Sequence, residues 1–237
     1  EGERGSSLGK NSGRSALIAA EIALSLILLV AAGLLMKSFV RLTQVNPGFN
    51  PDRLLIFNIG LASSADPARQ ASFYSEVVER LRTVPGVRSA GAVSRLPLAG
   101  GNSSRSFNIP GSSQSYSADI RVSTPDYFKT MGIPLLHGRN FTVHDSGGAL
   151  PVAIINQAAA ANIFPGQNPI GKSLTNFGPA MVKLQIVGVV GNVRHVALET
   201  AERPEVYLPL AQAAWPSMFI ALRSAVSNPL SLIPAVQ

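Results

Sequence analysis

The residues that most suggest chemistry are those at positions 166–173, which read GQNPIGKS. Gly166, Gly171, Lys172 and Ser173 occupy every fixed position of the nucleotide-binding pattern G-x-x-x-x-G-K-[ST]. In proteins that use this pattern, backbone N–H groups cradle the phosphates, the lysine reaches the terminal phosphates and the hydroxyl group binds magnesium. Taken alone, the motif predicts an ATPase or a GTPase.

The segments on either side of this loop argue against that prediction. A phosphate-binding loop follows a strand and opens a helix, whose N-terminus faces the phosphates. Here a short helix is expected before the loop, at residues 157–164 (QAAAANIF), and the sequence after it, SLTNFGP, contains Gly178 and Pro179. Pro169 also removes one N–H group from the loop. We therefore expect a structural loop, and no enzymatic activity in this chain.

Histidine, cysteine and serine residues indicate no other site. His137 and His144 lack the i, i+4 spacing that places two imidazoles on one metal ion from a helix. The chain has no cysteine, which excludes disulfide bonds, thiol nucleophiles and cysteine-bound zinc. Ser94 and Ser123 have no histidine nearby in the sequence to activate them. No catalytic residue, cofactor or metal is predicted.

Charged residues are few and dispersed, at 14% of the chain. Glu76 and Glu79 should both lie on the solvated face of one helix, and no pair of carboxylates stands out as a catalytic pair. The formal net charge is +7, but the lysines and arginines are scattered along the chain. Nucleic-acid binding usually requires a clustered basic surface, so it is not predicted.

A continuous apolar segment at residues 16–36 reads ALIAAEIALSLILLVAAGLLM. At about 1.5 Å per residue this length spans the hydrocarbon core of a membrane, and it exceeds the apolar stretch of a signal peptide. We predict a membrane-spanning helix at residues 16–37, after a cytoplasmic segment at residues 1–15. Basic residues flank both ends, with Arg4, Lys10 and Arg14 before it and Lys37 and Arg41 after it. Charge therefore favours a cytoplasmic N-terminus only weakly.

Glu21 is the one charged residue inside this segment. An ionised carboxylate in hydrocarbon is costly, so such residues usually face protein or water. Glu21 lies about one turn from the start of the apolar segment. We expect it to reach the interface or to face a neighbouring helix.

The remainder of the chain predicts an α+β domain after a connector at residues 38–52. A strand at 54–61, a helix that Asp66 and Pro67 open, and a strand at 87–96 form a crossover unit. The apolar face expected for its helix consists of Phe73, Val77, Leu81 and Val84. Residues 100–117 should be a flexible loop interrupted by a short strand at 106–109. Further strands are expected at 118–123, 152–156, 182–190, 206–209 and 218–223, with helices at 125–131 and 157–164 and a helix start at 228–237.

Several long segments, taken in order, resemble one known family. They read LSLILLVAAGLLMKSFVRLTQVNPGFNPDRLLIFNIGL, YSEVVERLRTVPGVRSAGAVSRLPLAGG, RVSTPDYFKTMGIPLLHGRNFTVHD, VAIINQAAAANIFPGQNPIGKSL and IVGVVGNVRHVALETAERPEVYLPLAQ. The sequence is similar to MacB/FtsX-like ABC transporter permeases with a MacB-like periplasmic core domain, and most similar to the duplicated acidobacterial type. In that family the FPG-x-x-PIGK segment is a structural loop, which here comprises Phe164, Pro165, Gly166, Pro169, Ile170, Gly171 and Lys172.

The resemblance implies a domain arrangement. Residues 53–99 and 216–237 would form a porter-like α/β subdomain, whose second half is truncated, and residues 100–215 an inserted strand-rich, sabre-like subdomain. The domain would lie in the periplasm, and the chain would sit in the bacterial inner membrane with a cytoplasmic N-terminus. Family permeases carry several membrane helices, so one span here implies a fragment, and Glu21 would face protein.

The resemblance also implies partners. The ATPase would be a separate chain, and the other partners would be the remaining permease helices, a second permease in a dimer and possibly a periplasmic protein. The chain would transmit ATP-driven motion to a periplasmic partner or substrate. The alternative hypothesis is a single-span anchored module that binds or senses a periplasmic ligand without transport.

Overall fold

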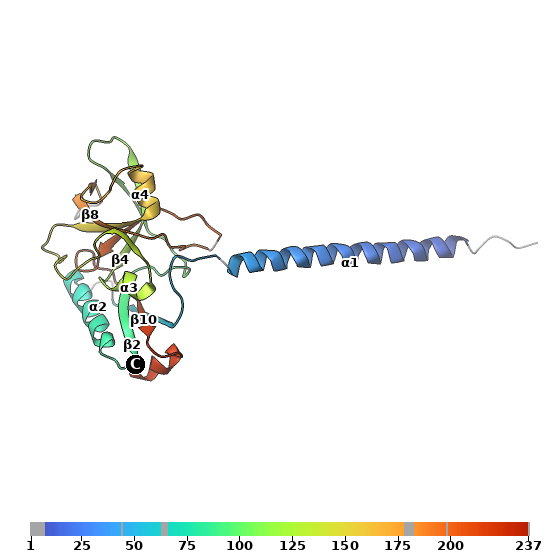
Figure 1. Cartoon of the computed structure of the whole chain (residues 1–237), viewed down its shortest axis with the longest axis horizontal. Coiled ribbons are helices and arrows are strands. Elements are labelled where there is room, and N and C mark those ends of the chain that lie inside the picture. The colour runs from blue at the N-terminus through green and yellow to red at the C-terminus, as the bar shows by residue number, and fades with distance from the viewer. Residues whose placement is uncertain (1–7, 44, 63–65, 178–182, 198, 237) are drawn as a thin grey trace, which may run out of the picture. The chain divides into compact units, whose positions relative to one another are not determined.

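The apolar N-terminal sequence forms one long helix, α1 (Leu8–Thr43), in the computed structural model (Figure 1). The structure describes residues 8–43, 45–62, 66–177, 183–197 and 199–236. By length and composition, Gly13–Arg41 could cross a membrane, a longer stretch than the predicted 16–37. Its apolar side chains are exposed all round. Such a helix requires lipid or other protein around it. Residues 1–7, with Arg4, lie outside the described residues.

A second unit begins at Asn46. Its first strands are β1 (Leu54–Gly60) and β2 (Val87–Val93), joined through helix α2 (Pro67–Arg82). Strand β10 (Ser217–Ser224) pairs antiparallel with both of them. The two strands of the predicted crossover are therefore parallel to each other, but β10 lies between them. The side chain of Tyr74 fixes α2 on this sheet by donating to the carbonyls of Ile59 and Pro216, both at 2.8 Å.

The predicted apolar face of α2 is partly confirmed, because Leu81 is buried and Val77 packs against the core. Asp66 caps the helix as expected, accepting from the Arg69 N–H at 3.1 Å. Phe73, however, is 38% exposed. The buried stripe consists of Gln70, Tyr74, Val78 and Leu81. This stripe was not predicted, because Gln70 and Tyr74 are polar residue types. The hydroxyl group of a buried tyrosine can nevertheless bond to backbone carbonyls while its ring packs in the core.

The other strands form a ring. Its six strands, as described, are β3 (Ser104–Asn108), β4 (Ser115–Ser123), β6 (Val152–Asn156), β7 (Ser173–Thr175), β8 (Lys183–Val190) and β9 (Glu205–Pro209). The pairing runs β4-β3-β7-β8-β6-β9 and returns to β4 through a parallel β4–β9 pair. β5 (Leu135–Gly138) pairs with β8 outside the ring. Helix α4 (Gln157–Ile163) belongs to this half. Helix α3 (Tyr127–Met131), which follows β4, packs against β2 and β10 of the first sheet.

Two sequence predictions need correction in this half. The flexible loop predicted at 100–117 is largely a hairpin, in which β3 pairs with β4 from Ser104↔Asp119 to Asn108↔Ser115. Strands β5 and β7 were not predicted, because each is too short for an alternating pattern. Val182, the predicted first residue of β8, and Gly178 and Pro179 lie outside the described residues.

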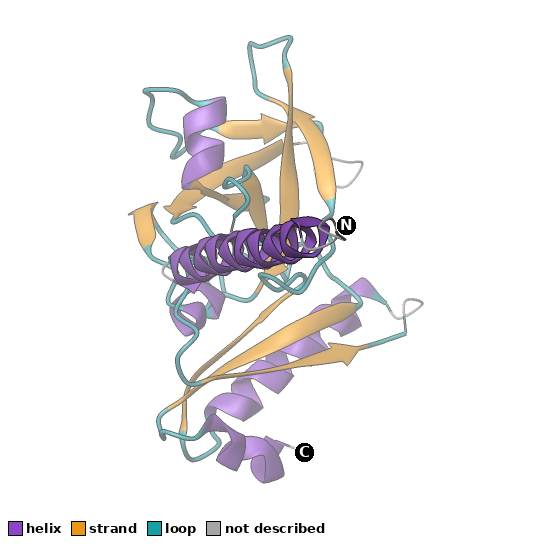
Figure 2. Cartoon of the chain, turned by 90° about the vertical axis from the view of Figure 1, so that its right-hand side faces the viewer, coloured by secondary structure: helices purple, strands orange, loops and turns teal. Residues whose placement is uncertain are grey.

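The two sets of strands, visible in Figure 2, meet at a narrow junction. Strands β2 and β4 share one residue pair, Val93↔Ser123. Around it, backbone bonds run from the Ser94 N–H to Val122 O at 2.8 Å and from the Thr124 N–H to Ala92 O at 3.0 Å. The hydroxyl groups of Ser94 and Thr124 accept from the Val122 and Ala92 N–H groups at 2.9 Å and 2.8 Å. The predicted subdomain boundaries at 99/100 and 215/216 stay a prediction.

Two hydrophobic clusters form the core of this unit. The larger draws on α2, β2, β4, β6, β8 and β10. The smaller surrounds α3, where the rings of Phe128 and Tyr207 meet edge to face with centroids 4.9 Å apart. After β10, Asn228 caps a short 3-10 helix η1 (Pro229–Leu232), followed by α5 (Ile233–Val236). The predicted helix start therefore begins at Asn228, and Gln237 lies outside the described residues.

Candidate functional site

The nucleotide-like loop at residues 166–173 connects helix α4 to strand β7. The helix before the loop is the predicted one, whereas the strand after it was not predicted. The order helix, loop, strand is the reverse of the order that phosphate binding requires. Phe164 and Pro169 are buried, and Ser173 pairs with Gln185 as the first residue of β7. The loop therefore does not open a helix whose N-terminus could face phosphates.

Backbone N–H groups of this loop are already bonded within the protein. The Gln167 N–H donates to Phe164 O, and the Lys172 N–H donates to Pro169 O. The Gly171 N–H donates to Ile186 O, and the Ile170 N–H donates to Asn168 Oδ1. The four distances are 2.8–3.1 Å. The Lys172 ammonium group donates to Gln167 Oε1 and lies 5.0 Å from the centroid of the Phe164 ring. These N–H groups cannot bind phosphate without breaking the turns that shape the loop.

Replacing Lys172 with alanine is expected to leave ATP binding unchanged, because we expect neither protein to bind ATP. The stability should fall by less than about 1 kcal/mol, since the lysine makes only solvent-accessible contacts. Equilibrium dialysis with labelled ATP and magnesium measures the first quantity, and urea unfolding measures the second. Binding by the parent chain that Lys172→Ala abolishes would contradict the structural role predicted for the loop.

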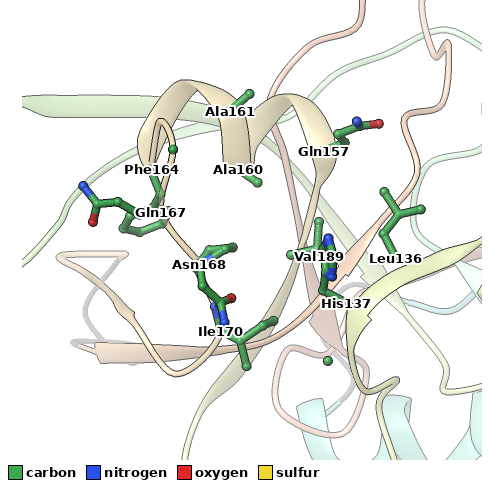
Figure 3. A pocket seen from close by; sticks show the side chains of 13 residues that line it. Leu136, His137, Gln157, Ala160, Ala161, Phe164, Gln167, Asn168, Ile170 and Val189 are labelled. Atoms are coloured by element: carbon green, nitrogen blue, oxygen red, sulfur yellow. The ribbon is translucent and has the colours of Figure 1, made fainter.

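A hollow of about 680 Å³ lies beside this loop. Strand β5, helix α4, the loop and Val189 of β8 line it. Figure 3 shows Leu136 and His137 on one side and Phe164 and Gln167 on the opposite side. Its volume is in the range of small-ligand sites, which are usually apolar with a few polar groups.

A buried charge cluster lies where β4 and β9 pair. The Arg121 guanidinium group is fully buried and lies 3.2 Å from Glu205 Oε1 and 4.0 Å from Asp119 Oδ2. Asn102 Oδ1 accepts from the same nitrogen at 3.1 Å. His195 Nε2 lies 3.1 Å from Glu205 Oε1. Sequence analysis missed this cluster, because its residues come from separate strands and loops and only the β4–β9 register brings them together.

The negative charge of this cluster affects nearby tyrosines. The Tyr207 hydroxyl donates to Glu205 Oε2 at 2.7 Å. Burial, and then the Glu205 carboxylate, raise the pKa of Tyr207 well above its usual value. Burial and the same carboxylate raise the pKa of Tyr127. Both tyrosine side chains therefore stay neutral near neutral pH.

The segment that leads into the second unit, residues 46–52, is held by Arg223 of β10. Its guanidinium group donates to three backbone carbonyls: Thr130 O at 2.8 Å, Asp52 O at 2.5 Å and Asn50 O at 2.8 Å. The Asn50 N–H donates back to Met131 O at 2.8 Å. Burial, and then the nearby charge of Arg88, lower the pKa of Arg223. From here on the name connector denotes residues 46–52 only, the part of the segment predicted at 38–52 that belongs to the second unit.

The connector is also bonded to the ring half. Pro47 O accepts from the Arg194 N–H at 2.9 Å. Gly48 has φ +85°, and a Cβ atom there would lie 2.0 Å from Asn192 O. The connector thus contacts β10 and α3 on one side and the segment after β8 on the other. It is the one described segment before β1 that touches both sets of strands.

The remaining predicted residues lie apart. His137 lines the hollow, His195 belongs to the charge cluster, and His144 lies in the loop before β6. Within the described residues, no three or more histidine, aspartate or glutamate side chains are placed to hold a metal ion. Glu21 is exposed on α1, and its role stays a prediction.

Comparison with known proteins extends along nearly the whole chain. The family described as MacB-like periplasmic core domain matches residues 15–230. No curated protein sequence matches the chain.

Among solved structures, the periplasmic region of MacB from Actinobacillus actinomycetemcomitans is similar with a TM-score of 0.53 and 18% identity, over 83% of this chain and 86% of that one. The extracellular domain of the noncanonic ABC-type transporter YknZ from Gram-positive bacteria has a TM-score of 0.48 and 17% identity, over 77% and 88%. A domain of a putative permease from Porphyromonas gingivalis has a TM-score of 0.49 and 16% identity, over 78% of this chain and 81% of that one. At the identity of the first match, the likeness shows a shared fold, and the predicted α+β class is confirmed.

Proposed function

Because the chain belongs to the family of MacB-like periplasmic core domains, we propose that it is the first membrane helix and the periplasmic domain of an ABC-type transporter permease. In this proposal α1 spans the bacterial inner membrane with its N-terminus in the cytoplasm. ATP hydrolysis takes place on a separate ATPase subunit, and the permease acts as a dimer. The domain passes the resulting motion to a periplasmic partner or substrate. Transport itself belongs to the assembly.

The observation that carries this proposal is the connector. Motion of a membrane helix reaches a following domain only through the covalent chain and the contacts that the chain makes. Here Arg223 binds two connector carbonyls, those of Asn50 and Asp52, together with the Thr130 carbonyl of α3, and the Arg194 N–H binds Pro47 O. A pull on the connector therefore acts on both sets of strands at the point beside their narrow junction.

The junction between the sets of strands suits a hinge. One residue pair joins β2 and β4, and hydroxyl groups of Ser94 and Thr124 complete the bonding. Hinges consist of a few residues that absorb a change in backbone angles while the packed parts on each side move as units. Both hydrophobic clusters contain residues of the two sets of strands, so a bend at the junction would require side chains within these clusters to shift past one another.

Replacing Arg223 with methionine is expected to abolish ATP-dependent motion of the domain while ATP hydrolysis continues. The permease, assembled with its ATPase in nanodiscs, would carry spin labels at Ser72→Cys on α2 and Asn162→Cys on α4. The chain has no native cysteine, so labelling is specific. The label distance should change on ATP binding in the parent and stay constant in Arg223→Met.

Arg88→Met is the matched control, because Arg88 is an exposed arginine on the neighbouring strand β2. It should keep the ATP-dependent change in distance. A parent protein that hydrolyses ATP with no change in distance would overturn the proposal. An unchanged response in Arg223→Met would show that the connector does not carry the motion.

A further inference from the structure

One strand edge of the domain is unpaired and exposed. Strand β5 pairs with β8 along one edge, and no strand among the described residues pairs with its other edge. All four of its residues, Leu135–Gly138, are exposed. A free edge presents backbone N–H and C=O groups that an additional extended chain can bond, and natural proteins usually protect such edges. This one carries neither proline nor lysine within the strand, although its four-residue length and the bulge between Leu135 and His137 limit the backbone groups that it offers.

The free edge borders the hollow that α4 and the loop enclose. Leu136, His137 and Gly138 of β5 are part of its lining, and Ala160 and Ala161 of α4 form another wall (Figure 3). A chain added to β5 would direct alternate side chains to opposite faces, because side chains alternate along a strand. One set of side chains could then enter the hollow.

The lining of the hollow selects an uncharged occupant. It contains no Asp, Glu, Lys or Arg, although the chain as a whole has a net charge of +7. Its polar groups are the amides of Gln157, Gln167 and Asn168 and the imidazole of His137, which lie beside apolar side chains such as Phe164. A charged side chain would lose hydration there without gaining a counter-charge, whereas apolar and amide side chains match the lining.

The walls of the hollow are fixed before any partner binds. A Cβ atom at Gly138, which has φ +74°, would lie 2.2 Å from Val187 O and 2.8 Å from Ile170 Cδ1. The absence of a side chain at Gly138 thus lets β5 approach both β8 and the loop closely. The loop itself is held by its internal hydrogen bonds. A preformed surface loses little conformational freedom on binding.

We propose that the free edge of β5 and the adjacent hollow bind an extended, uncharged peptide segment of a partner protein by strand addition. Backbone groups of the peptide bond to β5, and its alternate side chains fill the hollow. The FPG-x-x-PIGK loop then serves as the wall that shapes the side-chain site. This inference rests on the proposed function only for the compartment in which the partner is met.

The experiment selects octapeptides from a random phage-displayed library on the full chain in nanodiscs, without ATP. Enriched peptides should lack charged residues in their central positions. The affinity of a synthetic enriched peptide should fall about threefold to tenfold when single backbone nitrogens are methylated at alternate positions, and stay unchanged at the positions between. This alternating pattern is specific to strand addition, because only every second N–H faces the neighbouring strand.

Two tryptophan variants locate the binding surface. Ala161→Trp fills the hollow from the exposed face of α4 and should weaken peptide binding about tenfold or more. Asn162→Trp places the same side chain at the next, equally exposed position, which does not line the hollow, and should leave binding unchanged. Circular dichroism of both variants checks the fold.

Two results of the selection would overturn the inference: no more peptide recovered on the parent chain than on Ala161→Trp, or recovery of charged peptides. Two binding results would also overturn it: an equal loss of peptide affinity on methylation of every backbone nitrogen, or tighter binding of an uncharged oligosaccharide, such as a chitin hexamer, than of the peptide. Because no ATP is present, such a failure would leave the label-distance experiment untouched. Conversely, loss of ATP-dependent motion would not alter peptide affinity.

Discussion

Replacing Arg121 with methionine is expected to lower the free energy of unfolding by about 3–5 kcal/mol, which is the usual cost of removing one partner from a buried ion pair. The Arg121 side chain is 0% exposed, and those of Asp119 and Glu205 are 1% and 2% exposed. Methionine has a similar volume but no charge. The two carboxylates would then remain buried without their central cation, and this uncompensated charge causes the loss.

Urea unfolding of the chain in detergent measures this loss, with the fluorescence of Trp215, the one tryptophan, as the probe. Arg203→Met is the matched control. Its Nε lies 3.3 Å from Asp119 Oδ2, but its side chain is 53% exposed. Because the exposed Arg203 charge is largely hydrated and Arg121 remains beside Asp119, this variant should lose less stability than Arg121→Met. Equal losses in the two variants would contradict a special role for the buried arginine.

A second variant separates charge from packing. Adding Glu205→Gln to Arg121→Met removes one of the stranded carboxylates while keeping the side-chain size. If uncompensated charge causes the instability, the double variant should be more stable than Arg121→Met alone, because close charges do not contribute additively. A further loss would instead identify packing around Arg121 as the cause.

This cluster illustrates what a single sequence leaves open. Arg121 and Glu205 each interrupt an apolar strand pattern and would ordinarily be placed at the surface. Their strands are separated by more than seventy positions along the chain, and the parallel register Asp119↔Glu205 brings them together. Register follows from packing of the whole sheet, so local patterns do not determine it.

The elements that were predicted share a local signal. Strand β6 is bounded as predicted at Val152–Asn156, because an apolar run of β-branched residues precedes a helix cap, and Asn156 Oδ1 accepts from the Ala159 N–H at 2.9 Å. The helix before the nucleotide-like motif was predicted from the same kind of signal, whereas strand β7 after it was not predicted. Arg223, by contrast, bonds to Asn50 across 173 positions, and nothing in either segment indicates the partner.

Replacing Gly48 with alanine is expected to abolish the ATP-dependent motion of the domain with little loss of its stability. A Cβ atom there would lie 2.0 Å from Asn192 O and 2.9 Å from both Asn192 C and Val193 Cα. These are backbone atoms, so no rotation of a side chain relieves the overlap. The connector must leave the segment after β8, and the bond from the Arg194 N–H to Pro47 O is lost with it. Val193 and Phe49 belong to the smaller hydrophobic cluster, whereas the larger cluster contains no residue of this contact, so any loss of packing should be confined to the smaller cluster and the domain should stay folded.

Gly111→Ala provides a matched control for the backbone strain of this variant. Gly111 has φ +82°, close to the +85° of Gly48, but nothing lies within 4 Å of a Cβ atom built there. Both variants therefore carry the cost of a left-handed alanine, on the order of 1–3 kcal/mol, and only Gly48→Ala displaces the connector. The label distance between α2 and α4 should respond to ATP in Gly111→Ala and stay constant in Gly48→Ala. A response in both variants would show that motion reaches the domain without the Pro47–Arg194 contact, and loss in both would attribute the effect to strain alone.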